Sequence, residues 1–501
     1  MISLSGLPID SVINSPLLEK LNFANERLKK QDAMLWGKSA EKEALNRLGW
    51  IELPSRSLQL LSKFDAIAAL RRKNSISRIV LCGMGGSSLA PEVIAASHLE
   101  SEVPLFIVDS TDPVDLFPIL DSDLSQTLFI FASKSGSTVE TNSHRALFHA
   151  ELVKQNLAID EHLLVITDPG SALEIWAKDH GVQVLNGFAD VGGRFSALSA
   201  FGLGPAAICG ADVSILLDEA QDVANQLAQP NNPAALLALA IFQSGANFIS
   251  LPDLPMSQWV EQLIAESTGK DGKGFLPVIE EGQPKGANTL RIVSTATDGN
   301  NSKNEVLLTG SLGGQFLFWE WTTALLCNLI DVNPFDQPNV TLAKERANSV
   351  LAAKQYSVLP IKNSETPALL KSFVSNIAPS GYLGILAFLP RSFELQVDEI
   401  ANEFRKAIDV PVTIGWGPRY LHSTGQFHKG GTPTGSFLIL THEVEIDLEV
   451  PEQDYSFAQL QKAQALGDVA ALNENRLNLL HLPLTKELTL TKINQSLREV
   501  F

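Results

Sequence analysis

Four hydroxyl side chains and one lysine gather in a short turn of the chain. Residues 133–138 are Ser-Lys-Ser-Gly-Ser-Thr, directly after an apolar run and before a helical pattern. A phosphate monoester would be held by hydroxyls, an ammonium group and the free amide groups at a helix N-terminus. We therefore predict a phosphate-binding site in this turn. Its candidate residues are Ser133, Lys134, Ser135, Ser137 and Thr138.

A second turn is also suited to binding phosphate. Residues 82–88 are Cys-Gly-Met-Gly-Gly-Ser-Ser, in which glycines let the backbone approach a ligand and serines add donors. Gly86 and Ser87 are its candidate phosphate contacts. The turn lacks the lysine of a Walker loop, and Ser88 replaces the last glycine of a dinucleotide fingerprint, which argues against nucleotide binding. Either turn alone could be an ordinary capped loop, but the pair favours phosphate.

The elements around these turns alternate between strand and helix. Residues up to about 70 have the apolar spacing of amphipathic helices. Two turns carry a capping-box pattern, Ser137 to Glu140 and Ser171 to Glu174, which predicts helix starts. Repetition of strand, turn and helix indicates a parallel sheet covered by helices, with ligands at the carboxyl ends of the strands. The predicted strands of this unit are residues 78–82, 105–108, 127–131, 163–166 and 182–185.

A polar stretch near residues 218–232 separates this unit from a second one, for which we predict strands at 248–251, 290–293, 382–389 and 435–440 and an apolar helix at 316–329. The predicted fold class is α/β, with two doubly wound, flavodoxin-like parallel-sheet domains and helical segments at both ends. The predicted division is an N-terminal helical segment (1–70), a first domain (71–215), a second domain (216–445) and a C-terminal helical tail (446–501).

Composition excludes several classes of function. The net charge of -18 opposes binding to nucleic acid, and 45% hydrophobic residues describe an ordinary globular protein. The three cysteines are widely spaced and suggest neither a disulfide framework nor a zinc site. The N-terminus does not resemble a signal peptide, and the apolar stretch 315–330 is too short to span a membrane. We expect a cytoplasmic protein with no membrane or nucleic-acid partner.

Several motifs together resemble a known family. Residues 133–141 resemble the signature of sugar-isomerase (SIS) domains. Three further stretches, residues 191–203, 266–271 and 333–338, resemble signatures of the glucose-6-phosphate isomerase family. The similarity runs from about residue 36 to the C-terminal helices and is strongest to the isomerase part of fused transaldolase/isomerase proteins. It implies a homodimer without cofactor or metal. The implied reaction interconverts glucose 6-phosphate and fructose 6-phosphate through a cis-enediolate, in glycolysis and gluconeogenesis.

The resemblance also implies catalytic roles. Glu266 matches the proton-transfer carboxylate, Arg194 the cation that stabilises the enediolate, and Lys344 the lysine that assists ring opening. The family's histidine motif usually follows soon after the glutamate motif, whereas here residues 421–426 lie beyond Lys344. His422 fits that motif, while the nearby His428 could instead contact phosphate. Family members often take this histidine from the neighbouring subunit, and the displaced segment could make the same crossing.

Two other functions fit the same motifs. A non-catalytic phosphosugar-binding regulator would keep the turn at 133–138 but would not need Glu266, Arg194 and Lys344 together. A phosphosugar isomerase that also accepts mannose 6-phosphate would differ only in contacts to sugar hydroxyls. The sequence does not place those contacts.

Overall fold

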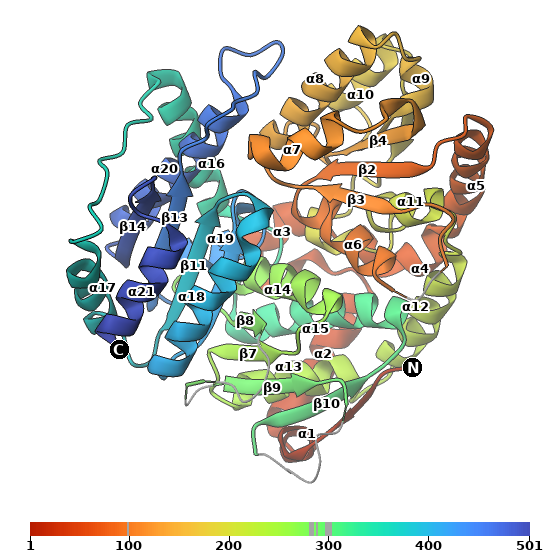
Figure 1. The fold of residues 1–501 in the computed structure, drawn as a ribbon. Coiled ribbons are helices and arrows are strands. Elements are labelled where there is room, and N and C mark those ends of the chain that lie inside the picture. Colours follow the sequence, from red (N-terminus) through yellow and green to blue (C-terminus); the bar gives the residue numbers. More distant parts are fainter. Residues whose placement is uncertain (98–99, 280–284, 287–288, 296–302) are drawn as a thin grey trace.

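The computed structural model describes residues 1–97, 100–279, 285–286, 289–295 and 303–501. Three β-sheets with helices around them form the structure, so the predicted α/β class is confirmed. Figure 1 shows the first sheet in orange at the top, the second mainly in green below it, and the third in teal and blue at the left.

The first sheet is parallel throughout and has the order β3-β2-β4-β5-β6. Every residue of β4 and β5 is buried, as expected for a sheet covered on both faces. Its strands are β2 (Arg78–Gly83), β3 (Leu105–Val108), β4 (Thr127–Ala132), β5 (Leu163–Thr167) and β6 (Gln183–Asn186), close to the predicted ranges. The associated helices are α5 (Leu58–Lys73), α6 (Leu89–Ala95), α7 (Pro113–Leu120), α8 (Val139–Lys154), α9 (Ile159–His162), α10 (Ala172–Asp179) and α11 (Ala200–Ile208).

The second sheet has the order β1-β10-β9-β7-β8, and only β1 runs antiparallel to its neighbour. Its strands are β1 (Ser3–Ser5), β7 (Phe248–Leu251), β8 (Leu276–Ile279), β9 (Thr289–Val293) and β10 (Glu305–Thr309). Its helices are α1 (Leu7–Val12), α2 (Pro16–Lys29), α12 (Ser214–Leu227), α13 (Pro233–Gln243), α14 (Pro255–Thr268) and α15 (Leu312–Ile330). In Figure 1, α14 lies near the centre of the molecule, between the three sheets.

The third sheet, parallel throughout, has the order β12-β11-β13-β14. Its strands are β11 (Tyr382–Phe388), β12 (Val412–Trp416), β13 (Gly435–His442) and β14 (Asn478–Leu484). The helices in this part are α16 (Pro338–Ala353), α17 (Thr366–Ser375), α18 (Glu394–Ala407), α19 (Gly425–Gly430), α20 (Phe457–Glu474) and α21 (Leu490–Val500). The shorter elements of the chain are α3 (Lys38–Ala44), α4 (Leu53–Arg56) and the 3-10 turns η1 (Ala33–Trp36), η2 (Gly49–Glu52), η3 (Gly85–Ser87), η4 (Leu124–Gln126), η5 (Gly193–Phe195), η6 (Arg391–Phe393) and η7 (Arg419–His422).

Three local expectations differ from the structure. The C-terminal segment predicted as a helical tail contains β14, whose Pro483 is tolerated because the strand lies at the sheet edge. The N-terminal segment predicted as helical begins with β1, which pairs with the distant β10. The strands predicted for residues 216–445 divide between the second and third sheets. The domain boundaries themselves stay a prediction.

The two capping boxes have different outcomes. Ser171 caps α10 by accepting a hydrogen bond from the amide of Glu174. The box predicted at Ser137 is wrong, because Thr138 is the N-cap residue of α8 and its side chain makes no capping bond. The Glu140 side chain is instead buried against another part of the chain, as described below.

No helix within the described ranges combines the length and the apolar character needed to cross a bilayer.

Candidate active site

A cavity of about 300 Å³ collects most of the predicted site residues. It lies where the loops after β2 and β4 meet α14, α16 and η7. This is the carboxyl end of the first sheet, where ligands of parallel sheets usually bind. The predicted residues that line it are Gly86, Ser87, Lys134, Ser135, Thr138, Arg194, Glu266, Lys344 and His422. Ser133 and Ser137 do not line the cavity, but each is bonded to a residue that does.

The predicted phosphate turn forms a compact loop between β4 and α8. Ser133 Oγ lies 2.8 Å from Thr138 Oγ1, and Ser135 Oγ lies 2.9 Å from Ser137 Oγ. Gly136 has a φ of 69°, and a Cβ there would lie 2.8 Å from the Cβ of Ser171, so only glycine fits. The loop thus presents its hydroxyls at the N-terminus of α8, where the helix dipole favours an anion.

The lysine of this turn is already paired. Lys134 Nζ donates to both carboxylate oxygens of Asp168, at 2.7 and 2.6 Å, and to the carbonyl of Phe188 at 2.7 Å. These three bonds use all the donors of an ammonium group. Burial lowers the pKa of Lys134, although the carboxylate of Asp168 opposes this shift. The predicted contact between the Lys134 ammonium and phosphate would therefore require breaking at least one of these bonds.

The loop after β2 fixes the position of Arg194. A Cβ at Gly86 would lie 2.1 Å from the carbonyl oxygen of Gly193, so a side chain at Gly86 would push the two loops apart. This close approach of η3 and η5 places the Arg194 side chain under the cavity. The sequence predicted that glycine lets this turn approach a ligand, and in the structure Gly86 also allows close packing against the Gly193 carbonyl.

Glu266 and Arg194 form a buried ion pair. Arg194 Nη1 lies 3.0 Å from Glu266 Oε1, and both side chains are less than a tenth exposed. Gln262, one turn earlier on α14, donates to Glu266 Oε2 at 3.1 Å. Arg194 also donates to Ser267 Oγ at 2.8 Å and to the carbonyl of Pro334 at 2.6 Å. A carboxylate and a guanidinium are therefore held rigidly side by side at the cavity wall.

His422 enters the cavity from η7 and is held by a carboxylate. Its Nε2 lies 2.9 Å from Glu140 Oε1, and the same oxygen accepts from Gln464 Nε2 at 2.6 Å. Burial raises the pKa of Glu140, but the charge and hydrogen bond of His422 outweigh it and lower this pKa to about 2. The main-chain carbonyl of His422 accepts from Gln262 at 2.8 Å. This pairing fixes the imidazole with Nε2 toward Glu140.

His428 does not reach the cavity. Its Nδ1 lies 2.8 Å from the hydroxyl of Tyr382, and its ring packs on Phe437 within the third-sheet core. Burial lowers the pKa of His428 well below its usual value. The possibility that His428 contacts phosphate is therefore wrong for this structure, and the next residue, Lys429, is paired with Asp468 at 2.5 Å.

Glu266 and His422 line one cavity of a single chain. The crossing of the histidine from a neighbouring subunit, considered from the sequence, is not needed to complete the site. The order of the motifs along the chain differs from the family pattern, but η7 returns to the cavity through the hydrogen bond between Gln262 and His422. Lys344, on α16, is exposed at the rim of the same cavity, and its charge helps to lower the pKa of Glu140.

Several cavity residues were not predicted. Gln262 lies four residues before Glu266, so the helical period of α14 could have indicated it. Gln337 lies within a motif already singled out, and its side chain accepts from Arg194 at 3.1 Å. Asp168, Glu43 and Arg47 also line the cavity, and no motif pointed to them.

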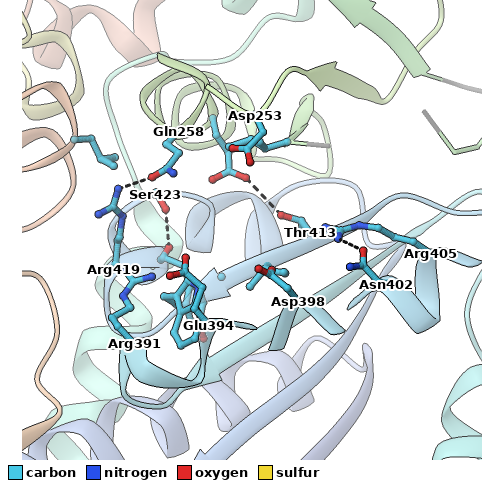
Figure 2. Close-up of a pocket in the computed structure, with 17 residues that line it drawn as sticks. Asp253, Gln258, Arg391, Glu394, Asp398, Asn402, Arg405, Thr413, Arg419 and Ser423 are labelled. Carbon is cyan, nitrogen blue, oxygen red and sulfur yellow. Dashed lines mark hydrogen bonds between the residues drawn. The ribbon is translucent and has the colours of Figure 1, made fainter. Parts of the chain in front are cut away.

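A second, larger cavity of about 470 Å³ lies on the other side of α14. Figure 2 shows that carboxylates from α18, including Glu394 and Asp398, face the space below α14. Burial raises the pKa of Glu261, the residue before Gln262 on α14, to about 8 in this cavity. None of the predicted site residues lines it, so size alone does not identify the active site.

Comparison with known proteins finds similarity to phosphoglucose isomerases. The family model of phosphoglucose isomerase matches residues 68–250, which include both phosphate-type turns and Arg194. The chain is therefore similar to the phosphoglucose isomerases in this part. It is 29% identical to the glucose-6-phosphate isomerase of Trichormus variabilis over 64% of this chain and 75% of that protein. The glucose-6-phosphate isomerase of Thermosynechococcus vestitus is also 29% identical, over 58% of this chain and 69% of its own length.

Two solved structures share much of the fold of this chain. A hypothetical protein from Thermus thermophilus has a TM-score of 0.59 and 26% identity, covering 70% of this chain and all of that one. A glucose-6-phosphate isomerase from Chlamydia trachomatis has a TM-score of 0.56 and 19% identity, covering 75% and 92% of the two chains. At 19% identity, the similarity to the Chlamydia trachomatis structure supports a shared fold only.

Proposed function

We propose that this chain is a glucose-6-phosphate isomerase that interconverts glucose 6-phosphate and fructose 6-phosphate. The observation that carries the proposal is the buried pair of Glu266 and Arg194 in the same cavity as the phosphate loop. An aldose-ketose isomerase needs a carboxylate that carries a proton between adjacent carbons and a cation beside the developing oxyanion. It also needs an anchor for the distant phosphate, which the loop before α8 supplies.

In the proposed mechanism, Glu266 takes the proton from C2 of the open-chain aldose and returns it to C1, while the hydroxyl proton passes from O2 to O1. The electron pair left at C2 forms the double bond between C1 and C2, and the carbonyl electrons move to O1, so the negative O1 of the cis-enediolate faces Arg194. The guanidinium is already fixed by Ser267 and Pro334, so little reorganisation is required when charge develops. The proton returns to the substrate, and the reaction therefore requires no redox cofactor.

Ring opening precedes this proton transfer. His422 is oriented by Glu140 and borders the cavity, and Lys344 lies at the same rim. In the proposed role, these two groups move protons between the ring oxygen and the C1 hydroxyl. The phosphate group meanwhile rests on the hydroxyls of Ser135 and Thr138 and on Ser87 across the cavity.

The buried pair of Glu266 and Arg194 also favours an enzyme over a non-catalytic regulator. A regulator that only binds phosphosugar gains nothing from a buried carboxylate at the cavity wall, since burial of an ion pair rarely adds net stability. The finer proposals are that the enzyme works in the cytoplasm and as a homodimer. Three free, buried cysteines are consistent with a reducing compartment.

A coupled assay tests the function directly. The purified chain is incubated with glucose 6-phosphate, and fructose 6-phosphate formation is followed with and without a chelator. Turnover that survives the chelator supports the proposal, and activity on mannose 6-phosphate in a parallel assay would define the substrate range. Phosphosugar binding without turnover would favour the regulator. The Glu266→Gln variant is the negative control, because it removes the proposed base.

A further inference from the structure

Arg47 is a cation at the catalytic cavity that has no carboxylate partner. It lies just after α3, and among the described residues no ion pair involves its guanidinium. Its printed hydrogen bonds are both from Nη1, to the carbonyl of Asn46 at 3.0 Å and to the carbonyl of Ala189 at 3.3 Å. Nε and Nη2 donate to no atom of the described chain. These two nitrogens form the edge with which arginine binds phosphate bidentately.

Main-chain contacts fix Arg47 beside the loop at residues 189–194, which leads to Arg194. Leu48 forms an antiparallel bridge with Val191, and the amide of Gly49 donates to the carbonyl of Asp190 at 3.0 Å. The Arg47 side chain therefore runs along the loop that leads to Arg194. A Cβ at Gly192 would lie 3.7 Å from Arg47 Cδ, which confirms this contact. Backbone pairing, rather than a salt bridge, sets the position of the side chain.

Arg47 also lies near the phosphate loop. Its charge contributes to lowering the pKa of Lys134 and opposes the burial that raises the pKa of Asp168. Lys134 and Arg47 donate to the carbonyls of consecutive residues, Phe188 and Ala189, so both cations contact the same short segment. They differ in one respect. The charge of Lys134 is matched by Asp168, whereas that of Arg47 is not.

Glu43 is the other charged residue of this segment at the cavity. Its carboxylate accepts from Asn333 Nδ2 at 3.3 Å and forms no ion pair with Arg47 in the structure. Two ion pairs at the cavity carry no net charge. They are Lys134 with Asp168 and Arg194 with Glu266. The cations without a carboxylate partner among the described cavity residues are Arg47 and Lys344, and with the unpaired Glu43 carboxylate they leave one net positive charge for an anion.

We infer that Arg47 is the side-chain cation that binds the phosphate group of the substrate. This inference rests on the proposed function and assigns to Arg47 the contact that the sequence suggested for the Lys134 ammonium. Arg47 would also attract the anionic substrate locally. Such a cation is needed because the chain carries a net charge of -18, which repels a phosphate ester at long range.

The test measures phosphate binding separately from catalysis. Inorganic phosphate is titrated by calorimetry into the full chain and into Arg47→Gln, Arg47→Lys and Arg56→Gln. Arg56 is the matched control, because it is a nearby arginine paired with Asp190 at 2.6 Å and does not line the cavity. Arg47→Gln should weaken phosphate binding about tenfold and raise KM for the sugar phosphate similarly, with kcat changed less than about threefold. Arg56→Gln should bind phosphate as the wild type does.

A charge-conserving variant and the salt dependence of the kinetics give two further measurements. Arg47→Lys keeps the charge but loses the paired donors, so its phosphate affinity should lie between those of the wild type and Arg47→Gln. Added salt should reduce kcat/KM more in the wild type than in Arg47→Gln. Unchanged phosphate affinity in Arg47→Gln would overturn the inference, whatever its activity. If the wild type binds phosphate through Arg47 but isomerises no hexose phosphate, the proposed function fails and the inference stands.

Discussion

The carboxylate of Glu266 and the guanidinium of Arg194 are joined at 3.0 Å, although the two residues are on different elements, α14 and η5. Each has a further anchor, Gln262 for the carboxylate and Ser267 for the guanidinium. The pair therefore holds a carboxylate and a guanidinium in fixed positions on one wall of the cavity, as the proposed base and electrostatic stabiliser require. This preorganisation leads to tests of each group.

Glu266→Gln should reduce kcat by at least about a hundredfold with little change in KM, because the amide keeps the shape but accepts no proton. Steady-state kinetics with glucose 6-phosphate measure both constants. Glu261→Gln is the matched control, since Glu261 is on the same helix but faces the larger cavity. Near-normal turnover of Glu266→Gln would remove Glu266 from the mechanism.

Replacing Ser135 and Thr138 together by alanine should mainly raise KM and weaken inhibition by inorganic phosphate. Phosphate contacts are made in the ground state and in the transition state alike, so their loss appears chiefly as weaker binding. Inhibition constants for phosphate give the measurement, and Ser375→Ala, at an exposed serine of α17, is the control. An unchanged inhibition constant would place the phosphate elsewhere.

His422→Ala should mainly reduce turnover, whereas His428→Ala should mainly reduce thermal stability. His422 lines the cavity, so its loss should reduce turnover, whereas His428 is buried against Tyr382 and its loss should mainly lower Tm. Kinetics and thermal melts of both variants separate the two roles. A larger loss of kcat in His428→Ala, with its Tm intact, would sink the assignment of His422.

Mixing Glu266→Gln with His422→Ala should restore no activity. Both side chains line the cavity of one chain, so every site in a hybrid dimer keeps one damaged group. The experiment unfolds and refolds an equal mixture of the variants and assays the product. If the sites were shared between subunits, simple counting predicts recovery of about a quarter of the wild-type activity. That recovery would contradict the single-chain site.

Glu320→Gln should stabilise the protein most at neutral and alkaline pH. Glu320 is fully buried in α15, and burial raises its pKa well above the usual value of 4.5. Above pH 4.5 the unfolded chain loses this proton while the folded chain keeps it. The stability contributed by the protonated group is therefore present below pH 4.5 and decreases as pH rises toward the folded-state pKa.

Urea unfolding at pH 5 and at pH 8 checks this pH dependence. The variant should gain more over the wild type at pH 8 than at pH 5, because the amide binds no proton in either state. Glu345→Gln, at an exposed position on α16, is the control and should show no such difference. An equal gain at both pH values would show that ionisation of Glu320 is not the cause.

Local patterns in the sequence determined the strands of the first sheet and the hydroxyl-rich loop at residues 133–138. Buried parallel strands are continuous apolar runs, and a loop of hydroxyls before a helix has a distinct composition, so both are visible without tertiary contacts. The family motifs likewise indicated Glu266 and Arg194. The strand β14 contains Pro483, and proline argues against a strand unless that strand lies at a sheet edge. The sequence alone does not show that β14 lies at an edge.

Tertiary structure alone decided which charged side chains at the cavity lack an ion-pair partner. Lys134 was a natural phosphate ligand by composition, but folding brings Asp168 and the Phe188 carbonyl to its ammonium. Arg47 belongs to no motif, yet the bridge between Leu48 and Val191 places it at the cavity without a carboxylate partner. The charge that a side chain presents to a ligand depends on partners far away in the chain. Such partners are set by packing between segments, which local sequence patterns do not contain.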